Sequence, residues 1–179
     1  MNKNRKLRLL VTGQCPNKCP MCCNNRFELE KIPVVDRFDY EQIMITGGEP
    51  LLFPDQTRIL VSTLEDAAQI CGYHPKIYIY TANFDIEAFD CLCASVDGFV
   101  YTPHKKKDVD AFLELNEYIL NGLAISGHLS LRLNIFPEVE TFFPRDTDLS
   151  LWKVKRMEWV KDCPVPEGED FRRIAELWK

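Results

Sequence analysis

The chain has 179 residues, of which 46% are hydrophobic and 27% charged, a composition typical of one globular domain rather than of a disordered chain. It carries 22 Lys and Arg against 27 Asp and Glu, and the net charge of −5 argues against a broad binding surface for nucleic acid or anionic membrane. No apolar run approaches the roughly 20 residues of a membrane helix, and Leu9–Val11 is too short for a signal-peptide core. We therefore expect a cytoplasmic protein with neither a nucleic-acid nor a membrane partner.

Six short segments are predicted to be strands, because each is rich in β-branched or aromatic residues and is bounded by Gly, Pro, Asn or Asp. In chain order they are residues 7–13, 42–47, 76–82, 96–102, 128–136 and 152–160. Apolar residues recur with helical spacing in residues 56–71, 85–94, 108–121 and 167–178. In the last of these, Phe171, Ile174 and Leu177 stand at positions i, i+3 and i+6. Strands that alternate with helices predict βαβ units and hence a parallel sheet.

The fifth predicted strand alternates between two kinds of side chain. Ser130, Arg132 and Asn134 are interleaved with leucine and isoleucine, so one face is apolar and the other polar. A strand covered by helices on both faces reads instead as a continuous apolar run. The alternation favours an incomplete (β/α) barrel of five or six mostly parallel strands with a ligand on its concave side; an edge strand with one wet face is the alternative. We expect a single domain over residues 1–179, with its core at about 7–136 and a C-terminal extension, 137–179, that holds the sixth strand and the last helix.

Four of the eight cysteines fall within nine residues, on the loop after the first strand. Cys15, Cys19 and Cys22 have the spacing C-x3-C-x2-C, and Cys23 directly follows. Three thiolates can hold three corners of a [4Fe–4S] cubane and leave the fourth iron open, whereas electron-transfer clusters and structural zinc sites use four closed ligands. The other cysteines form no second motif of this kind: Cys71, Cys91, Cys93 and Cys163. Structural zinc and cysteines that merely fill a core are the alternatives.

A second motif, Gly47-Gly48-Glu49-Pro50, ends the second predicted strand. Two glycines let the main chain approach a ligand without a side-chain collision, so that its amide and carbonyl groups can bind an α-ammonium or α-carboxylate. Glu49 can help to neutralise a cation, and Pro50 stiffens the exit. A plain strand-to-helix turn is the alternative, because Gly and Pro are common there.

With both motifs, each at the carboxyl end of a strand, the chain resembles the radical S-adenosylmethionine (radical SAM) superfamily through about residue 136. The resemblance implies that Cys15, Cys19 and Cys22 hold a [4Fe–4S] cluster and that residues 47–50 contact S-adenosylmethionine, whose amino and carboxylate groups chelate the open iron. Met21 stands where the superfamily usually has an aromatic residue. Its thioether can pack beside the adenine or the cluster.

The resemblance also implies a reaction and its partners. The reduced cluster, supplied by a donor such as flavodoxin or ferredoxin, cleaves S-adenosylmethionine to methionine and a 5′-deoxyadenosyl radical, which takes a hydrogen atom from the substrate. The shortest members of the superfamily resemble two functional types. One type activates glycyl-radical proteins, and the other is similar to 7-carboxy-7-deazaguanine synthase and acts on a small 7-deazapurine precursor. Thr102–Lys105 is similar to a segment of the latter, but Cys23-Asn24 departs from its magnesium-binding pair, so both stay open. A non-catalytic iron–sulfur or zinc protein is the alternative class.

Further candidates follow the later strands. Arg132, with Ser130 and Asn134, is a candidate for the carboxylate or ribose of S-adenosylmethionine, because a guanidinium binds carboxylates bidentately; a structural ion pair is its alternative. His104 and Lys105 are candidates for an anionic substrate or proton transfer, against a solvated loop. The residues that act on the substrate itself are not identified. Tyr78 and Tyr80 share one face of the third strand, where packing is the ordinary role, and Thr81–Asn83 only partly matches the superfamily's Thr-Asn-Gly.

Overall fold

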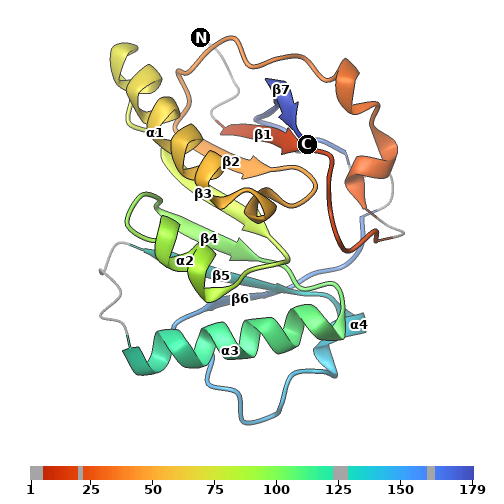
Figure 1. Cartoon of the computed structure of the whole chain (residues 1–179). Coiled ribbons are helices and arrows are strands. Elements are labelled where there is room, and N and C mark those ends of the chain that lie inside the picture. The colour runs from red at the N-terminus through yellow and green to blue at the C-terminus, as the bar shows by residue number, and fades with distance from the viewer. Residues whose placement is uncertain (1–5, 20–21, 123–128, 161–163) are drawn as a thin grey trace.

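The computed structural model describes residues 6–19, 22–122, 129–160 and 164–179, which form one seven-stranded sheet. All neighbouring strands are parallel, in the order β6-β5-β4-β3-β2-β1-β7 (Figure 1). The strands are β1 (Lys6–Thr12), β2 (Gln42–Thr46), β3 (Lys76–Thr81), β4 (Gly98–Tyr101), β5 (Ser130–Ile135), β6 (Lys153–Arg156) and β7 (Glu169–Trp178). The α/β class and the parallel sheet are confirmed, and the sheet is open, with β6 and β7 as its edges.

Helices follow the strands along the chain, and the three longest, α1, α2 and α3, lie on one face of the sheet (Figure 1). The helices are α1 (Pro54–Ile70), α2 (Ile86–Leu92), α3 (Lys106–Gly122) and the short α4 (Pro137–Glu140); 3-10 turns span Cys23–Arg26, Leu29–Lys31 and Pro50–Leu52. On this covered face, alternate strand residues such as Leu9, Ile45 and Phe99 are 0% exposed and pack in one core with helix residues such as Val61 and Phe112. Burial of these apolar side chains from water is the main favourable term in folding.

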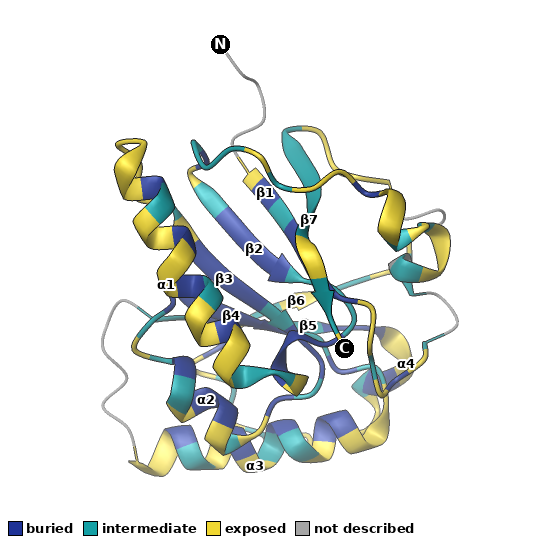
Figure 2. Ribbon diagram, turned by 45° about the horizontal axis from the view of Figure 1, so that its top comes forward, coloured by how far each residue is buried: buried dark blue, intermediate teal, exposed yellow. Residues whose placement is uncertain are grey.

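The other face of the sheet mixes half-buried polar residues, such as Arg8, Thr46 and Tyr80, with buried residues such as Met44 and Val100; Figure 2 shows how burial varies along the strands. Arg8, Met44 and Tyr78 stand side by side in register across β1, β2 and β3, and Gly98 and Ser130 continue the row across β4 and β5. We call this the open face. Polar side chains on this face are found on β1, β2, β3 and β5, whereas β4 presents Gly98 and Val100 there.

The predicted helix over residues 167–178 is wrong, because the segment forms β7 and pairs in parallel with β1 from Lys6↔Glu169 to Leu10↔Arg173. Without this strand, β1 would present an edge of unpaired N–H and C=O groups. Side chains add to the pairing: Arg8 donates to Glu169 at 2.8 Å, and the Tyr40 hydroxyl donates to Asp170 at 2.8 Å. Long-range pairing thus overrides the local i, i+3, i+6 pattern.

The predicted C-terminal extension is part of the same sheet. Its strands β6 and β7 pair with β5 and β1 and form the two edges. Of the helices in the described ranges, none has the length and apolar character needed to cross a membrane.

Candidate functional site

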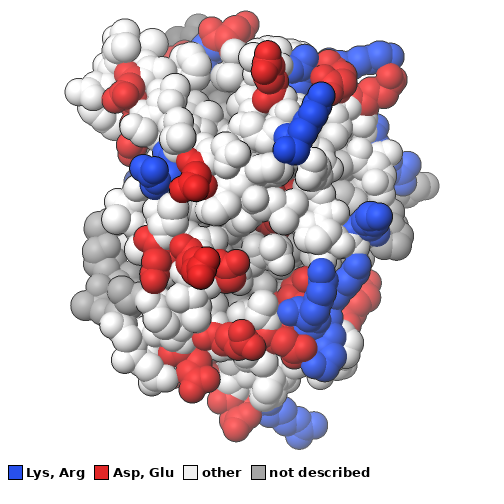
Figure 3. Space-filling view, viewed as in Figure 1, with Lys and Arg blue, Asp and Glu red and all other residues white. Residues whose placement is uncertain are grey.

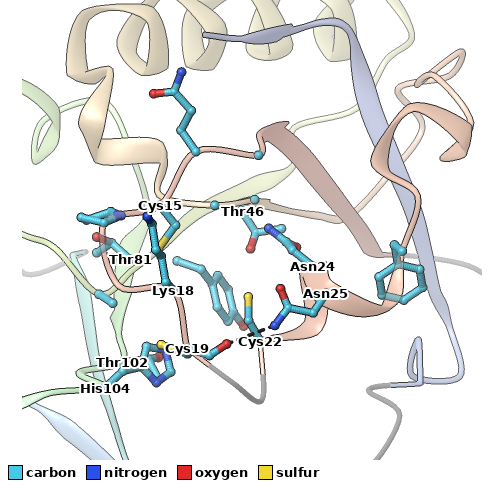
Figure 4. Close-up of a pocket in the computed structure, with 18 of the residues that line it drawn as sticks. Cys15, Lys18, Cys19, Cys22, Asn24, Asn25, Thr46, Thr81, Thr102 and His104 are labelled. Atoms are coloured by element: carbon cyan, nitrogen blue, oxygen red, sulfur yellow. Dashed lines mark hydrogen bonds between the residues drawn. The ribbon is translucent and has the colours of Figure 1, made fainter.

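A pocket of about 910 Å³ lies over the open face at the carboxyl ends of the strands (Figure 4). The segment that follows each of the strands β1 to β6 contributes to its lining, from Cys15 after β1 and Gly47 after β2 to Trp159 after β6. Crevices at the carboxyl ends of parallel strands are where α/β proteins bind their ligands. The volume falls within the range of small-molecule sites.

The three cysteines of the C-x3-C-x2-C motif line this pocket together (Figure 4). All three are free thiols of intermediate burial. Burial raises the pKa of Cys15 and of Cys19, and in each case the charge of Cys22 raises the pKa further, which places the three sulfurs within electrostatic range. An iron–sulfur cluster fits this donor set, because soft thiolates are the preferred ligands of iron–sulfur centres.

The same thiols do not form a site for a single ion. Within residues 6–19, 22–122, 129–160 and 164–179, no three or more His, Cys, Asp or Glu side chains are grouped so that they could hold one metal ion. A structural zinc site needs four ligands at about 2.0–2.3 Å in a closed tetrahedron. Structural zinc and an iron–sulfur cluster thus differ in the number of protein ligands that each requires, four for the first and three for a cluster with an open iron.

A buried carboxylate at the start of α3 holds the loop after β1 that carries Cys15, Cys19 and Cys22, which we call the cysteine loop. Asp108, 3% exposed, accepts a hydrogen bond from the Asn17 side-chain amide at 2.8 Å, between Cys15 and Cys19. The same oxygen accepts the backbone N–H groups of His104 at 2.9 Å and Lys105 at 3.0 Å. Carboxylates are stabilising at this position because the first amides of a helix lack partners within the helix.

Lys105 completes the brace from the other side, since its ammonium group donates to the backbone carbonyl of Asn17. The sequence analysis assigned no role to Asn17 or Asp108. An acidic residue at the third position of a helix is a capping signal. Asp108 stands at that position of α3, so this signal could have indicated it. Nothing in the sequence pairs it with Asn17.

The two glycines of the second motif let β2 lie against the cysteine loop. Gly48 N donates to Thr12 O at 2.6 Å, and Glu49 N donates to Gln14 O at 2.7 Å. A Cβ atom on Gly48 would lie 1.9 Å from Gln14 O, and one on Gly47, whose φ is 146°, would lie 2.6 Å from Thr12 O. Glycine is required here by close contact between two backbones. Gly47 and Gly48 also line the pocket.

Glu49 lies beneath the pocket and does not belong to its lining. Its side chain, 1% exposed, accepts hydrogen bonds from Leu51 N at 3.0 Å, Ala82 N at 2.9 Å, Asn83 N at 3.1 Å and the Thr81 hydroxyl at 2.7 Å. The carboxyl group thus ties the end of β2 to the end of β3. Burial raises its pKa to about 7, against the opposing effect of these hydrogen bonds. Pro50 is also buried and lies outside the lining.

The candidates on β5 lie on the open face but outside the pocket lining. The Arg132 guanidinium stacks over the Tyr78 ring, 4.4 Å from its centroid, and its Nε donates to the Ser130 hydroxyl at 3.3 Å. Asn134 donates to the hydroxyl of Thr102, which does line the pocket, at 3.1 Å. Met21, the remaining candidate, lies outside the described residues.

His104 belongs to an aromatic wall of the pocket and not to a solvated loop. The rings of Phe136 and Trp159 are stacked at 4.0 Å and 10°, and the His104 ring lies 5.7 Å and 5.5 Å from their centroids. All three residues line the pocket. Burial lowers the pKa of His104, which favours the neutral ring. The sequence did not predict a role for Phe136 or Trp159. They follow β5 and β6, and they meet at the pocket only because these two strands pair in the sheet.

A scan of protein-family models finds no match to this chain, and no curated protein matches its sequence. The evidence for its function is therefore the spacing of its motifs and the geometry of the pocket. That geometry joins three thiols, two glycines of a neighbouring strand end and a wall of stacked rings around one cavity.

Proposed function

We propose that this chain is a radical SAM enzyme, built on an incomplete (β/α) barrel, that binds one [4Fe–4S] cluster through Cys15, Cys19 and Cys22. One observation carries the proposal: the three thiols of the C-x3-C-x2-C motif and the glycines of the Gly-Gly-Glu-Pro motif line the same pocket at the carboxyl ends of parallel strands. Two short motifs that stand about 25 residues apart in the sequence thus line one cavity.

When bound, the cluster and S-adenosylmethionine would supply a 5′-deoxyadenosyl radical that takes a hydrogen atom from the substrate. The chain's own contribution is to hold and orient these groups. The thiols of the three cysteines lose their protons as they become ligands. Asp108 and Lys105 hold the loop between them, and Gly47 and Gly48 bring main chain to the pocket surface without a Cβ.

The pocket beyond the thiols favours an enzyme over a non-catalytic iron–sulfur protein. Its lining continues from the cysteine loop along the open face to Arg8 and Tyr80, and across to the aromatic wall. A cluster that served only in electron transfer or structure would need no such cavity. We further propose a small electron-transfer protein, such as flavodoxin or ferredoxin, as the source of the electron.

The test is anaerobic reconstitution of the full chain with iron and sulfide. About four irons and four sulfides should bind per chain, and addition of dithionite and S-adenosylmethionine should release 5′-deoxyadenosine, measured by chromatography. Cys19→Ala should abolish both results, and Cys23→Ala, its matched neighbour, should preserve them. Stoichiometric zinc that iron does not replace, or a cluster without 5′-deoxyadenosine, would contradict the enzyme assignment.

A further inference from the structure

A cluster of lysines at the start of α3 lies beside the cysteine loop. Residues Lys105–Lys107 are all exposed, and Lys18 is exposed on the loop itself. The ammonium group of Lys105 donates to the carbonyl of Asn17, the residue before Lys18, so the two segments adjoin. We call Lys18 and Lys105–Lys107 the basic patch. Figure 3 shows lysine and arginine side chains gathered over this end of α3.

The stability of α3 does not account for these lysines. The positive end of the helix dipole lies at the first turn, where cations are unfavourable, and the last turn of α3 has no basic residue. Lys106 has an exposed ion pair with Asp110 at 2.7 Å. Among the described residues, neither Lys18 nor Lys107 forms an ion pair. The basic patch thus costs helix stability, which points to a role at the surface.

Two other carboxylates near the basic patch have partners of their own. Asp108 is 3% exposed and accepts its hydrogen bonds from Asn17 and from backbone N–H groups. Glu138 on α4 accepts a hydrogen bond at 3.1 Å from Trp159, the ring that stacks on His104. Neither carboxylate pairs with a lysine of the patch. The ammonium groups of the patch are therefore accessible to carboxylates of another molecule.

The basic patch borders the proposed cluster site. Lys18 directly precedes Cys19 and lines the pocket. Burial raises the pKa of Cys19, and the charge of Lys105 acts in the opposite direction, so this ammonium group lies within electrostatic range of the Cys19 sulfur. Lys106 and Lys107 do not belong to the lining, so the patch extends from the pocket to the outer surface. A protein bound there would lie against the cysteine loop.

We propose, on the premise that the chain holds the cluster proposed above, that the basic patch docks a small redox protein whose own cofactor is surrounded by carboxylates. One electron passes from the reduced partner to the cluster: the partner is oxidised by one electron, the cluster is reduced by one, and no covalent bond forms or breaks. Four lysines suit the small, weak interfaces of electron-transfer complexes, in which charge guides the encounter. Nucleic acid suits the patch less well, because its four residues offer no aromatic ring on which a base can stack.

The test titrates an acidic flavodoxin and an acidic ferredoxin into the full chain by calorimetry at low ionic strength, where surface charges are least screened. The partner that binds identifies the source of the electron. Lys107→Glu should weaken its binding about fivefold, and Lys106→Glu, Lys107→Glu about twentyfold, because each change replaces an attraction by a repulsion. Glutamate is favourable at the start of a helix, so neither variant should lower the free energy of unfolding. Lys76→Glu, an equal change of charge at the amino end of β3, should bind as wild type does.

A second measurement separates docking from the chemistry of the cluster. Dithionite is a small reductant that needs no docking surface, so the double variant should form 5′-deoxyadenosine as fast as wild type with dithionite, and more slowly with the reduced partner. Binding of neither redox protein, equal binding by wild type and the double variant, or a patch that binds single-stranded RNA instead would overturn the docking proposal. Wild type that forms no 5′-deoxyadenosine with dithionite would overturn the enzyme assignment.

Discussion

The two faces of the sheet differ in the side chains that they carry. On the covered face, residues such as Leu9 and Ile45 are 0% exposed and belong to one hydrophobic core. On the open face, Arg8, Thr46 and Tyr80 are polar, half-buried and line the pocket. Successive side chains of a strand point to opposite faces of the sheet. The residues that stabilise the core and the residues that line the pocket therefore lie on different faces. Substitutions on the covered face should change the free energy of unfolding, and those on the open face should change binding.

Phe112→Ala should have the largest effect on the covered face. Its ring is 0% exposed and packs against Tyr101 at 5.3 Å and Trp152 at 4.9 Å. Truncation leaves a cavity and should lower the free energy of unfolding by about 3–5 kcal/mol, measured by urea denaturation. Tyr80→Phe on the open face, which removes one hydroxyl, should lower it by less than about 1 kcal/mol. An equal decrease in the free energy of unfolding for both variants would contradict the proposed difference between the two faces.

Asp108→Ala tests the point where the covered helix α3 meets the cysteine loop. Loss of its three hydrogen bonds should lower the free energy of unfolding by about 2–3 kcal/mol, and should reduce the iron bound per chain after reconstitution. Asp110→Ala is the matched control, because its ion pair with Lys106 is exposed and contributes about 0.5 kcal/mol or less. Full iron content in Asp108→Ala would mean that the brace does not position the cysteines.

Glu49 provides a prediction that depends on pH, and the direction of the change in stability follows from its raised pKa. Burial raises the pKa of Glu49 from 4.5 to about 7, so between these values the native state binds more protons than the unfolded state. Its contribution to stability is therefore largest below about pH 4.5 and declines as the pH rises to about 7, by at most about 1.4 kcal/mol per unit.

The measurement is the difference in the free energy of unfolding between wild type and Glu49→Gln across this pH range. Other titrating groups contribute equally to both proteins, so the difference isolates residue 49 and should fall as the pH rises. A difference that grows with pH would show that the four hydrogen bonds outweigh burial and hold the carboxylate ionised.

Most strands of the sheet were predictable, because their local composition and the turn residues that flank them indicate a strand. β2 and β3 are short runs such as Ile43–Ile45 between turn residues, and the structure places them as expected. That Cys15 and Gly47 directly follow β1 and β2 was predictable for a similar reason, because each motif stands next to a recognisable strand in the sequence.

Residues that depend on register were not predictable from the sequence. Phe171 and Arg8 become neighbours only when β7 pairs with β1, and the helical spacing of the 167–178 segment concealed that pairing. Asp108 meets Asn17 only when α3 packs beside the first loop. Local patterns carry no information about which distant segment supplies a partner.

The hydroxyl of Thr12, just before the cysteine loop, donates to the carbonyl of Trp178 at 2.9 Å and accepts the N–H of Gln14 at 3.1 Å. The loop's base is thus secured by a residue 166 positions further along the chain. During synthesis, the thiols leave the ribosome long before the strand that buttresses them. Under the function proposed above, iron loading on a nascent chain would meet an unsupported loop, and the order of translation would favour insertion of the proposed cluster after β7 has paired.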